Sequence, residues 1–509
     1  MLAQTTDFVG PSIDWWAISP LLVLLGGGLV LLVAAALTPR WPKGLHAVAT
    51  AAVAAGALVL SIFIWDDISD GGDRFVIASA LRVDRFALFL TIVICAAVIL
   101  AALLTDDFLR REDFDGPEVY GLYLMTAIGG VVMAAANDLV VLFLGLETLS
   151  IALYVLAASN RRRAESQESG LKYFILGSVS SAFLLYGIAL VYGATGTTHL
   201  TSSPAGESSI FSTLESTIFI GDTKTLLLAG IALLLVGLGF KVAAVPFHTW
   251  TPDVYQGAPT PVTGFMASAA KAAGFAALLR VLTYGLSSRV DDWRPVIWVM
   301  AILTVVVGSV LAVVQTNVKR MLAYSSISHA GFILVGVEAT SERGVQGALF
   351  YLIAYAVLVL GTFGVVTLVG RSGDAEHSLD AYRGLGRQRP ILAFALTVFL
   401  LAQAGVPLTS GFVAKFAVIG ASVDSGSYAL AIIAMLASAI AAYLYLRIIV
   451  SMYLSDPDPA DDERERVRIP PAAAVAITAS LVFTLVVGFL PGWLLDLARD
   501  AVPQFGLAR

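Results

Sequence analysis

Residues 239–280 read GFKVAAVPFHTWTPDVYQGAPTPVTGFMASAAKAAGFAALLR, and this stretch decides the fold. It is apolar enough to cross a membrane, yet it carries Lys241, His248 and Lys271. An ammonium group at bilayer depth is costly, so it persists where it faces protein or water and usually has a function. We therefore expect these side chains to lie inside a membrane protein and to take part in its activity.

The same stretch contains its own interruption. Pro246 removes a backbone donor, and Pro252, Pro259 and Pro261 follow closely. One helix must therefore end or kink and another begin near the middle of the span. Transporters build ion sites from broken helices beside buried charge.

The whole chain is too apolar for a soluble domain. Of its 509 residues 58% are hydrophobic and 13% charged, and the mean hydropathy is +0.85, which predicts an all-α polytopic membrane protein. The apolar run from Leu21 lacks a preceding basic segment and is interpreted as a first span, not a cleaved signal peptide. The single cysteine, Cys95, excludes disulfides, iron-sulfur clusters and thiolate zinc sites within the chain.

About 20 apolar residues are needed for each crossing, and the sequence accommodates fourteen crossings on this basis. The predicted spans are 21–37, 45–65, 86–104, 119–136, 139–158, 171–193, 226–247, 262–286, 296–314, 322–337, 345–368, 390–420, 428–453 and 472–497.

Basic residues predict the orientation. They concentrate in the loops after odd-numbered spans, which the positive-inside rule places in the cytoplasm, so both termini are expected outside it. These residues are Arg40, Lys43, Arg110, Arg111, Arg161, Arg162, Arg163, Lys319, Arg320, Arg371, Arg383, Arg387, Arg389, Arg464, Arg466 and Arg468. The exceptions in even-numbered loops are Arg74, Arg82, Arg289 and Arg294.

Two interrupted spans suggest an internal repeat. The sequence AVP at 244–246 and the sequence GVP at 405–407 lie five predicted spans apart. An odd offset reverses direction across the membrane, which is typical of two inverted five-helix units. The predicted divisions are residues 1–116 with three N-terminal helices, units at 117–288 and 289–454, and a polar loop and last helix at 455–509.

Four charged residues are predicted to lie well inside the bilayer: Glu147, Lys241, Lys271 and Lys415. They could be static ion pairs or side chains that extend to an interface. One carboxylate cannot neutralise three lysines, however, and the excess charge requires water or proton exchange. We therefore favour a function in proton transfer, in which movement of Glu147 relative to Lys241 changes how firmly the lysine holds a proton.

Three further residues are candidate relays. Lys172 lies near the start of its helix, where reaching to the interface is an equal alternative. His248 follows the Pro246 break and His329 lies in MLAYSSISHAGFILVG; each could relay protons or hydrogen-bond a helix end. The chain has no dinucleotide-binding or P-loop motif and no histidine pair with haem or metal spacing.

Three blocks carry a family resemblance: residues 245–280, GLKYFILGSVSSAFLLYG from Gly170, and NVKRMLAYSSISHAGF from Asn317. In this order they resemble the subunit N family of the proton-translocating NADH-quinone oxidoreductase, respiratory complex I. The resemblance covers roughly residues 119–420. It implies a fourteen-helix antiporter-like subunit with two inverted five-helix units and broken seventh and twelfth helices.

The resemblance also implies roles. Glu147, Lys241, Lys271 and Lys415 match the family's fifth-, seventh-, eighth- and twelfth-helix positions, and Lys172 and His248 fall on motif positions. A lysine at 415 favours the N-type over the M-type subunit. The implied partners are the lipid bilayer, protons and other membrane-arm subunits, including the M-type subunit. No nucleic acid and no metal ion are expected to bind. NADH, flavin, iron-sulfur clusters and quinone would belong to other subunits, and the location would be the bacterial plasma membrane.

Two alternatives remain at this point. One is a subunit of a cation/proton antiporter of the same fold, which sodium dependence would reveal. The other is a passive scaffold of the membrane arm. A scaffold would leave pumping intact when Lys271 is replaced.

Overall fold

The structure is a computed structural model that describes residues 13–503 apart from 39–41, 43, 113–115, 204–205, 371–373, 375 and 457–468. Six of the basic residues used for the orientation lie outside the described residues: Arg40, Lys43, Arg371, Arg464, Arg466 and Arg468. The polar segment after Ser455 is likewise outside them for most of its length.

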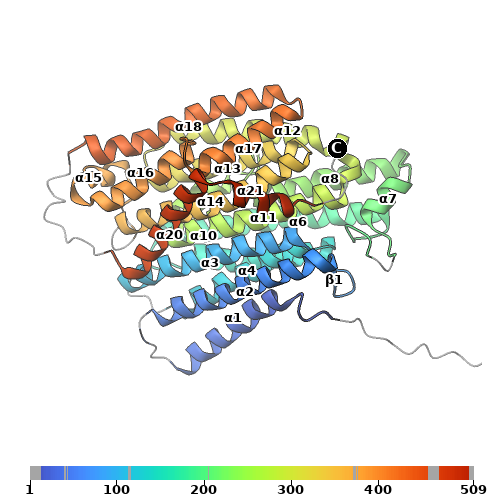
Figure 1. The fold of residues 1–509 in the computed structure, drawn as a ribbon, viewed down its shortest axis with the longest axis horizontal. Helices are drawn as coiled ribbons and strands as arrows, with labels where there is room; N and C mark the ends of the chain where they lie inside the picture. The colour runs from blue at the N-terminus through green and yellow to red at the C-terminus, as the bar shows by residue number, and fades with distance from the viewer. Residues whose placement is uncertain are drawn as a thin grey trace, which may run out of the picture.

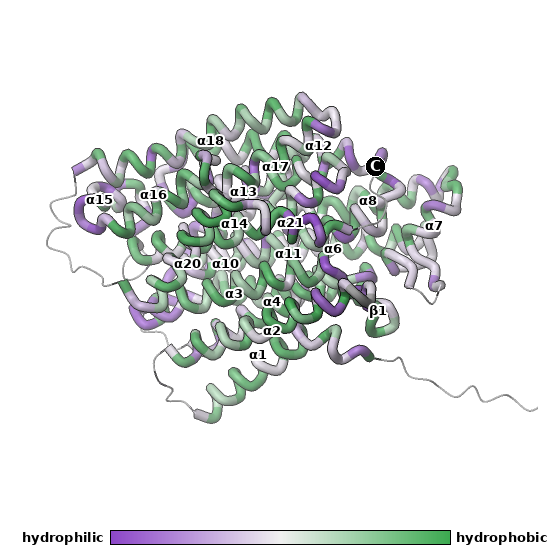
Figure 2. The backbone as a smooth tube through the Cα atoms, in the orientation of Figure 1, coloured by the Kyte–Doolittle hydropathy of each residue, from purple (hydrophilic) through white to green (hydrophobic). Residues whose placement is uncertain are grey.

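Long apolar helices run side by side through the molecule, and polar residues gather toward their ends (Figures 1 and 2). Within the described residues, thirteen helices are long and apolar enough to cross a membrane. They are α1 (Ser19–Leu37), α2 (Leu45–Gly71), α3 (Arg85–Arg111), α4 (Pro117–Ala135), α5 (Leu139–Ala157), α6 (Ala164–Thr195), α8 (Gly221–Lys241), the continuous segment Thr260–Gly285, α12 (Val290–Val313), α13 (Val318–Glu338), α14 (Glu342–Val369), α18 (Tyr428–Leu454) and α20 (Pro471–Phe489).

The twelfth predicted span consists of two short helices, α16 (Pro390–Ala404) and α17 (Ser410–Asp424). Together they add one crossing to the thirteen, which makes the fourteen that the sequence predicts. The seventh is also broken, because α8 is followed by a turn and the short helix α9 (Trp250–Gly257). Both predicted interruptions are therefore confirmed.

Several predicted boundaries are wrong, and at two of them a break in the helix explains the difference. The span predicted at 226–247 begins earlier and ends at Lys241, because Ala243 adopts a left-handed conformation with a φ of 61° before Pro246 is reached. The span predicted at 472–497 ends at Phe489, since Pro491 precedes a separate helix, α21 (Gly492–Asp500).

Several elements were not predicted. The segment Thr260–Gly285 comprises α10 (Thr260–Phe265), a π-helical turn η1 (Met266–Ala270), α11 (Lys271–Leu279) and a second π-helical segment η2 (Arg280–Gly285). The loops contain an antiparallel pair, β1 (Arg74–Val76) and β2 (Leu81–Val83), the helices α7 (Ile210–Ser216) and α15 (Leu385–Gln388), and the 3-10 turns η3 (Ser287–Arg289) and η5 (Leu379–Tyr382).

Three crossings form the interior of the molecule: the segment Thr260–Gly285, α13 and α14. Their most apolar stretches are almost entirely covered by other helices, whereas α1 leaves most of its surface exposed. The helices that carry Lys271 and His329 are therefore surrounded by protein. This position lets a polar group sit at membrane depth without contacting lipid.

Candidate functional site

The break after Lys241 is held by hydrogen bonds that replace the missing helical ones. The Trp250 indole N–H donates to the Phe240 carbonyl at 3.1 Å, and the Val245 N–H donates to Thr304 Oγ1 at 2.9 Å. Free backbone groups at a helix end need such partners when water is excluded. The break thus ends α8 at Lys241 and points the chain into α9.

Lys241 is buried and has a neutral partner. Its Nζ donates to Ser150 Oγ at 2.8 Å and lies 5.8 Å from the centroid of the Tyr173 ring. A cavity of about 10 Å³ adjoins Lys241 and Ser150, about the smallest that accommodates one water molecule.

Glu147 lies one helical turn before Ser150 on α5 and is half-buried. It accepts a hydrogen bond from the Ser181 hydroxyl of α6. Among the described residues no ion pair joins Glu147 to Lys241, and each is bonded to a serine hydroxyl instead. The Glu147 carboxylate and Ser150, whose hydroxyl accepts from the Lys241 amine, lie one helical turn apart on α5. The Ser181 hydroxyl is bonded to the carboxylate.

Lys271 lies at the centre of the molecule and is 3% exposed. Its Nζ donates to the Ser326 carbonyl at 2.5 Å and to Ser326 Oγ at 2.6 Å, and it lies 5.5 Å from the Tyr355 ring centroid. It begins α11 directly after the η1 turn. π-Helical turns occur frequently at functional sites.

His329 follows Ser326 on the same face of α13 and is buried in a polar cluster. Its Nδ1 lies 2.6 Å from the Tyr351 hydroxyl and its Nε2 3.3 Å from the Tyr445 hydroxyl. Tyr445 also contacts Ser325 Oγ at 2.6 Å. Hydroxyl groups therefore surround the imidazole, and hydroxyls can both donate and accept protons.

Lys415 lies on α17, close to the second break. Its Nζ donates to the Ala404 carbonyl at 3.0 Å and to Ser438 Oγ at 2.8 Å. It lies 4.8 Å from the centroid of Phe332, one turn beyond His329 on α13. Gly405 ends α16 with a φ of 89°, and a Cβ there would lie 3.0 Å from Lys415 Cδ. A glycine at this position both permits the break and leaves room for the lysine.

Together these residues form a line across the interior. Ser326, His329 and Phe332 recur every three residues on α13 and connect the surroundings of Lys271 to those of Lys415. Between Lys241 and Lys271 the contact is apolar: a Cβ at Gly274 would lie 3.2 Å from Lys241 Cγ. The acceptors that hold all three amines are hydroxyl or carbonyl oxygens and carry no charge.

Two predicted relay residues lie outside this line. Lys172 is partly exposed near the start of α6 and forms ion pairs with Glu168 at 2.7 Å and Asp253 at 2.9 Å. Burial alone would raise the pKa of Asp253, but hydrogen bonds from Lys172 and Arg320 lower it overall. His248 is half-buried in the turn between α8 and α9. The structure does not bring either residue to the three central amines.

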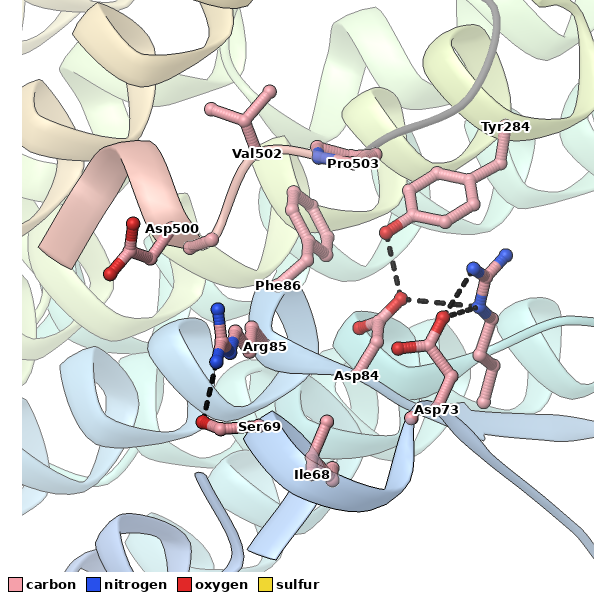
Figure 3. Close-up of a pocket in the computed structure, with 13 residues that line it drawn as sticks. Ile68, Ser69, Asp73, Asp84, Arg85, Phe86, Tyr284, Asp500, Val502 and Pro503 are labelled. Carbon is pink, nitrogen blue, oxygen red and sulfur yellow. Dashed lines mark hydrogen bonds and ion pairs between the residues drawn. The ribbon is translucent and has the colours of Figure 1, made fainter. Parts of the chain in front are cut away.

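Sequence reasoning missed a buried charge cluster at one end of α3. Arg280 donates through Nη1 and Nη2 to the Asp84 carboxylate at 2.7 Å each, and the Tyr284 hydroxyl donates to Asp84 at 2.7 Å. The cluster borders a cavity of about 250 Å³, beside which Arg82 forms ion pairs with Asp73 and Asp84 (Figure 3). Only the position of Arg280 at the end of an apolar span signalled that it needs a partner.

A second missed cluster lies at the opposite end of the same helices. Lys319 is fully buried and donates to Asp374 Oδ2 at 3.1 Å and to the Ala258 carbonyl at 2.6 Å. Asp374 also accepts from the Thr260 N–H at 3.1 Å and the Thr260 hydroxyl at 2.6 Å, at the start of α10. The two clusters fix both ends of the helix that carries Lys271.

Residues 136–441 match the family described as NADH:quinone oxidoreductase/Mrp antiporter, TM. The chain is 42% identical to NADH-quinone oxidoreductase subunit N of Trichlorobacter lovleyi over 486 residues, which is 95% of this chain and 96% of the relative.

Two solved structures share its fold. A chain of respiratory complex I from Thermus thermophilus with bound aureothin matches with a TM-score of 0.78 and 33% identity, covering 94% of this chain and 99% of that one. A chain of the Mrp complex from Dietzia matches with a TM-score of 0.81 and 22% identity over 97% and 98% of the two chains, a likeness of fold alone. The family model matches more than half of the chain, and the Trichlorobacter lovleyi relative is 42% identical over 95% of it, so the chain belongs to the family of NADH-quinone oxidoreductase subunit N.

Proposed function

We propose that this subunit conducts protons across the bacterial plasma membrane, driven by NADH oxidation and quinone reduction in other subunits of an NADH-quinone oxidoreductase. The observation that carries the proposal is that three buried amines, Lys241, Lys271 and Lys415, are held by uncharged oxygens. A permanently charged amine at such a site would lack compensation. An amine that gains and loses a proton spends part of the cycle neutral, which suits these surroundings.

Protons are taken up from the cytoplasmic side, load Lys241, and pass through water to Lys271. From there Ser326, His329 and the hydroxyls of Tyr351 and Tyr445 supply donors and acceptors toward Lys415, from which protons leave on the outer side. Glu147 sets the proton affinity of Lys241 through its charge. The serine bonded to each of these two groups allows the distance between them to change without leaving either unsatisfied.

The proposal includes the assembly and the location. The subunit works beside other membrane-arm subunits, including the M-type antiporter-like subunit, because both structural relatives named above come from multi-subunit complexes. NADH, flavin, iron-sulfur clusters and quinone are bound by other subunits. Both termini lie outside the cytoplasm, which the positions of Arg110, Arg111 and Arg161–Arg163 at one end of the helices favour.

The test is to purify the whole complex with Lys241→Ala, Lys271→Ala or Glu147→Ala and to reconstitute it in vesicles. Quinone-linked NADH oxidation and proton uptake are measured on the same preparation. We expect fewer protons per electron in each variant. An assembled complex in which all three variants pump the wild-type number of protons per electron would leave only a scaffold role.

A further inference from the structure

A polar cleft of about 350 Å³ opens at the end of the helices where α6, α9, α13 and the segment around His377 meet. Its walls carry charges of both signs, from Arg163, Glu165, Lys172, Asp253 and Arg320, and His377 also lines it. The loop of Arg161–Arg163 borders it, which places the cleft on the proposed cytoplasmic side. None of the central lysines lines it, so the line described above does not account for this feature.

His377 differs from the charged residues of the cleft because it is buried, with 4% exposure. Its Nε2 lies 2.7 Å from Asp374 Oδ1 and 3.4 Å from Thr260 Oγ1. Its Nδ1 is buried and has no hydrogen-bond partner among the described residues. A buried, unpaired ring nitrogen is costly, so it calls for a function or a ligand.

The surroundings determine which nitrogen carries the proton. Burial would raise the pKa of Asp374, but the charge of Lys319 and the bond to His377 lower it overall, so the carboxylate stays ionised. An ionised carboxylate only accepts hydrogen bonds, and Nε2 must therefore carry the hydrogen. Nδ1 is then a free base. A proton added to Nδ1 would produce an imidazolium ion already paired with Asp374.

The charged groups that face this histidine come from three sides. Arg163 at the start of α6 contacts both the carbonyl and the carboxylate of Asp374, Lys319 approaches from α13, and Tyr382 of η5 lies near the carboxylate. Burial lowers the pKa of His377, and the positive charge of Lys319 adds to this effect. The imidazole is therefore neutral in the resting state, with Nδ1 unprotonated and without a hydrogen-bond partner in the described part of the chain.

A connection leads from this site to the centre of the molecule. Lys319, next to the dyad, and Ser326, the partner of Lys271, lie seven residues apart on α13. Seven residues are two helical turns, about 10 Å along one face. Thr260, which also bonds Asp374, begins the helix that carries Lys271. The dyad thus sits at the cleft end of both helices that meet at Lys271.

We propose that the cleft is a mouth through which protons reach Lys271, beside the entry at Lys241 described above, and that His377, oriented by Asp374, is the group that takes them up. The step moves one proton from water in the cleft to Nδ1 and later releases it inward, with no net change in the histidine. The inference rests on the proposed proton-conducting function and names its uptake site. Asp374 is a positioning residue, since it holds the ring and stays ionised.

The experiment uses the whole complex in vesicles with His377→Ala and His377→Gln. The glutamine keeps an N–H donor for Asp374 but cannot take up a proton at neutral pH. We expect the rate of proton uptake carried by this subunit to fall by about a hundredfold, the lower end of the effect of a proton-transferring side chain. Asp380→Asn is the control, because Asp380 is an exposed carboxylate on the neighbouring turn.

Chemical rescue separates proton transfer from structure. Imidazole added on the side that the cleft faces is expected to restore uptake in His377→Ala, whereas pyrazole, a much weaker base of the same size, is not. Lys271→Ala is measured in parallel. If Lys271→Ala lowers pumping while both His377 variants pump as wild type, the uptake site is wrong and the proposed function stands. If neither change matters, the proposed function itself fails. Loss of assembly in both His377 variants, or equal rescue by both azoles, would show a structural role and overturn the inference.

Discussion

The Lys271 ammonium is held by two oxygen atoms of one residue, Ser326, and neither oxygen carries a charge. Lys241 and Lys415 are likewise held by uncharged oxygens, Lys241 by Ser150 and Lys415 by Ser438 and the Ala404 carbonyl. A buried charge without a counter-ion is costly, so stability alone would favour an apolar side chain at these positions. The repeated use of neutral acceptors is explained if each amine must be able to lose its proton.

Tyr445 offers the narrowest test at this scale, because its hydroxyl alone joins Ser325 to His329. Tyr445→Phe removes one oxygen and keeps the packing. We expect slower proton uptake with unchanged assembly, and a stability loss of about 1 kcal/mol, the usual net value of one hydrogen bond. The rate of proton uptake into vesicles tests the effect on proton transfer. A rate equal to that of the wild type would show that Tyr445 is not part of the proton path.

The lowered pKa of Asp374 predicts how its contribution to stability varies with pH. Its pKa is lowered in the folded protein, so its stabilising effect is fully present above the ordinary value of about 3.9 and is lost only as the pH falls below it. Asp374→Asn is therefore expected to lower the unfolding temperature of the purified complex equally at about pH 6 and about pH 8. A difference that appears at only one of these pH values would mean that another group titrates with it.

At this scale the sequence predicts the four charged residues within the spans but not which oxygens hold them. Glu147, Lys241, Lys271 and Lys415 stand out because their neighbours are apolar. Their serine partners do not, since a serine in a membrane helix usually satisfies its own backbone. The bond between Lys271 and Ser326 joins positions 55 residues apart, and only the packing of two helices brings them together.

Among the elements, the broken crossings were predictable because proline and glycine interrupt apolar runs at Pro246 and Gly405. The end of α8 at Lys241 was not, because it depends on the Thr304 hydroxyl of a different helix. The π-helical turns before and after α11 leave no pattern in the sequence. The buried clusters at the ends of α3 and α10 were also missed, since their partners lie in loops that fold back from distant parts of the chain.

The attachment of η2 to α3 makes a prediction about the elements. Breaking a buried charge pair costs up to about 3–5 kcal/mol, and in Arg280→Met only the more distant Arg82, among the described residues, would still pair with the Asp84 carboxylate. Arg280→Met is thus expected to reduce the amount of assembled subunit sharply. Arg383→Gln removes an exposed ion pair with Asp380 and should cost no more than about 1 kcal/mol. Quantifying the subunit in membranes after mild heating compares the two; similar losses would contradict the assigned role of Asp84.

The whole molecule consists of three covered interior crossings enclosed by other, predominantly hydrophobic helices (Figure 2). Charged clusters tie the structure at both ends, around Asp84 and around Asp374, while the amines lie between them. The titratable groups in the middle of the molecule therefore lie on helices whose two ends are held by buried ion pairs. Such an arrangement suits stepwise proton transfer more than large movements of helices.

This architecture also predicts the transported ion. Sodium is a hard cation that binds to oxygen ligands, whereas the central positions present amines. Replacing sodium by choline on both sides of the vesicle is expected to leave proton uptake per electron unchanged. A drop in uptake that returns on adding sodium would favour the antiporter alternative.

The most direct test of the central claim, that the buried amines carry protons, is the number of protons taken up per electron in vesicles containing Lys271→Met. Methionine fills much of the lysine volume but cannot bind a proton, so packing is largely kept. The account predicts an assembled complex that oxidises NADH yet takes up fewer protons per electron than wild type. An unchanged ratio at normal NADH oxidation would contradict it.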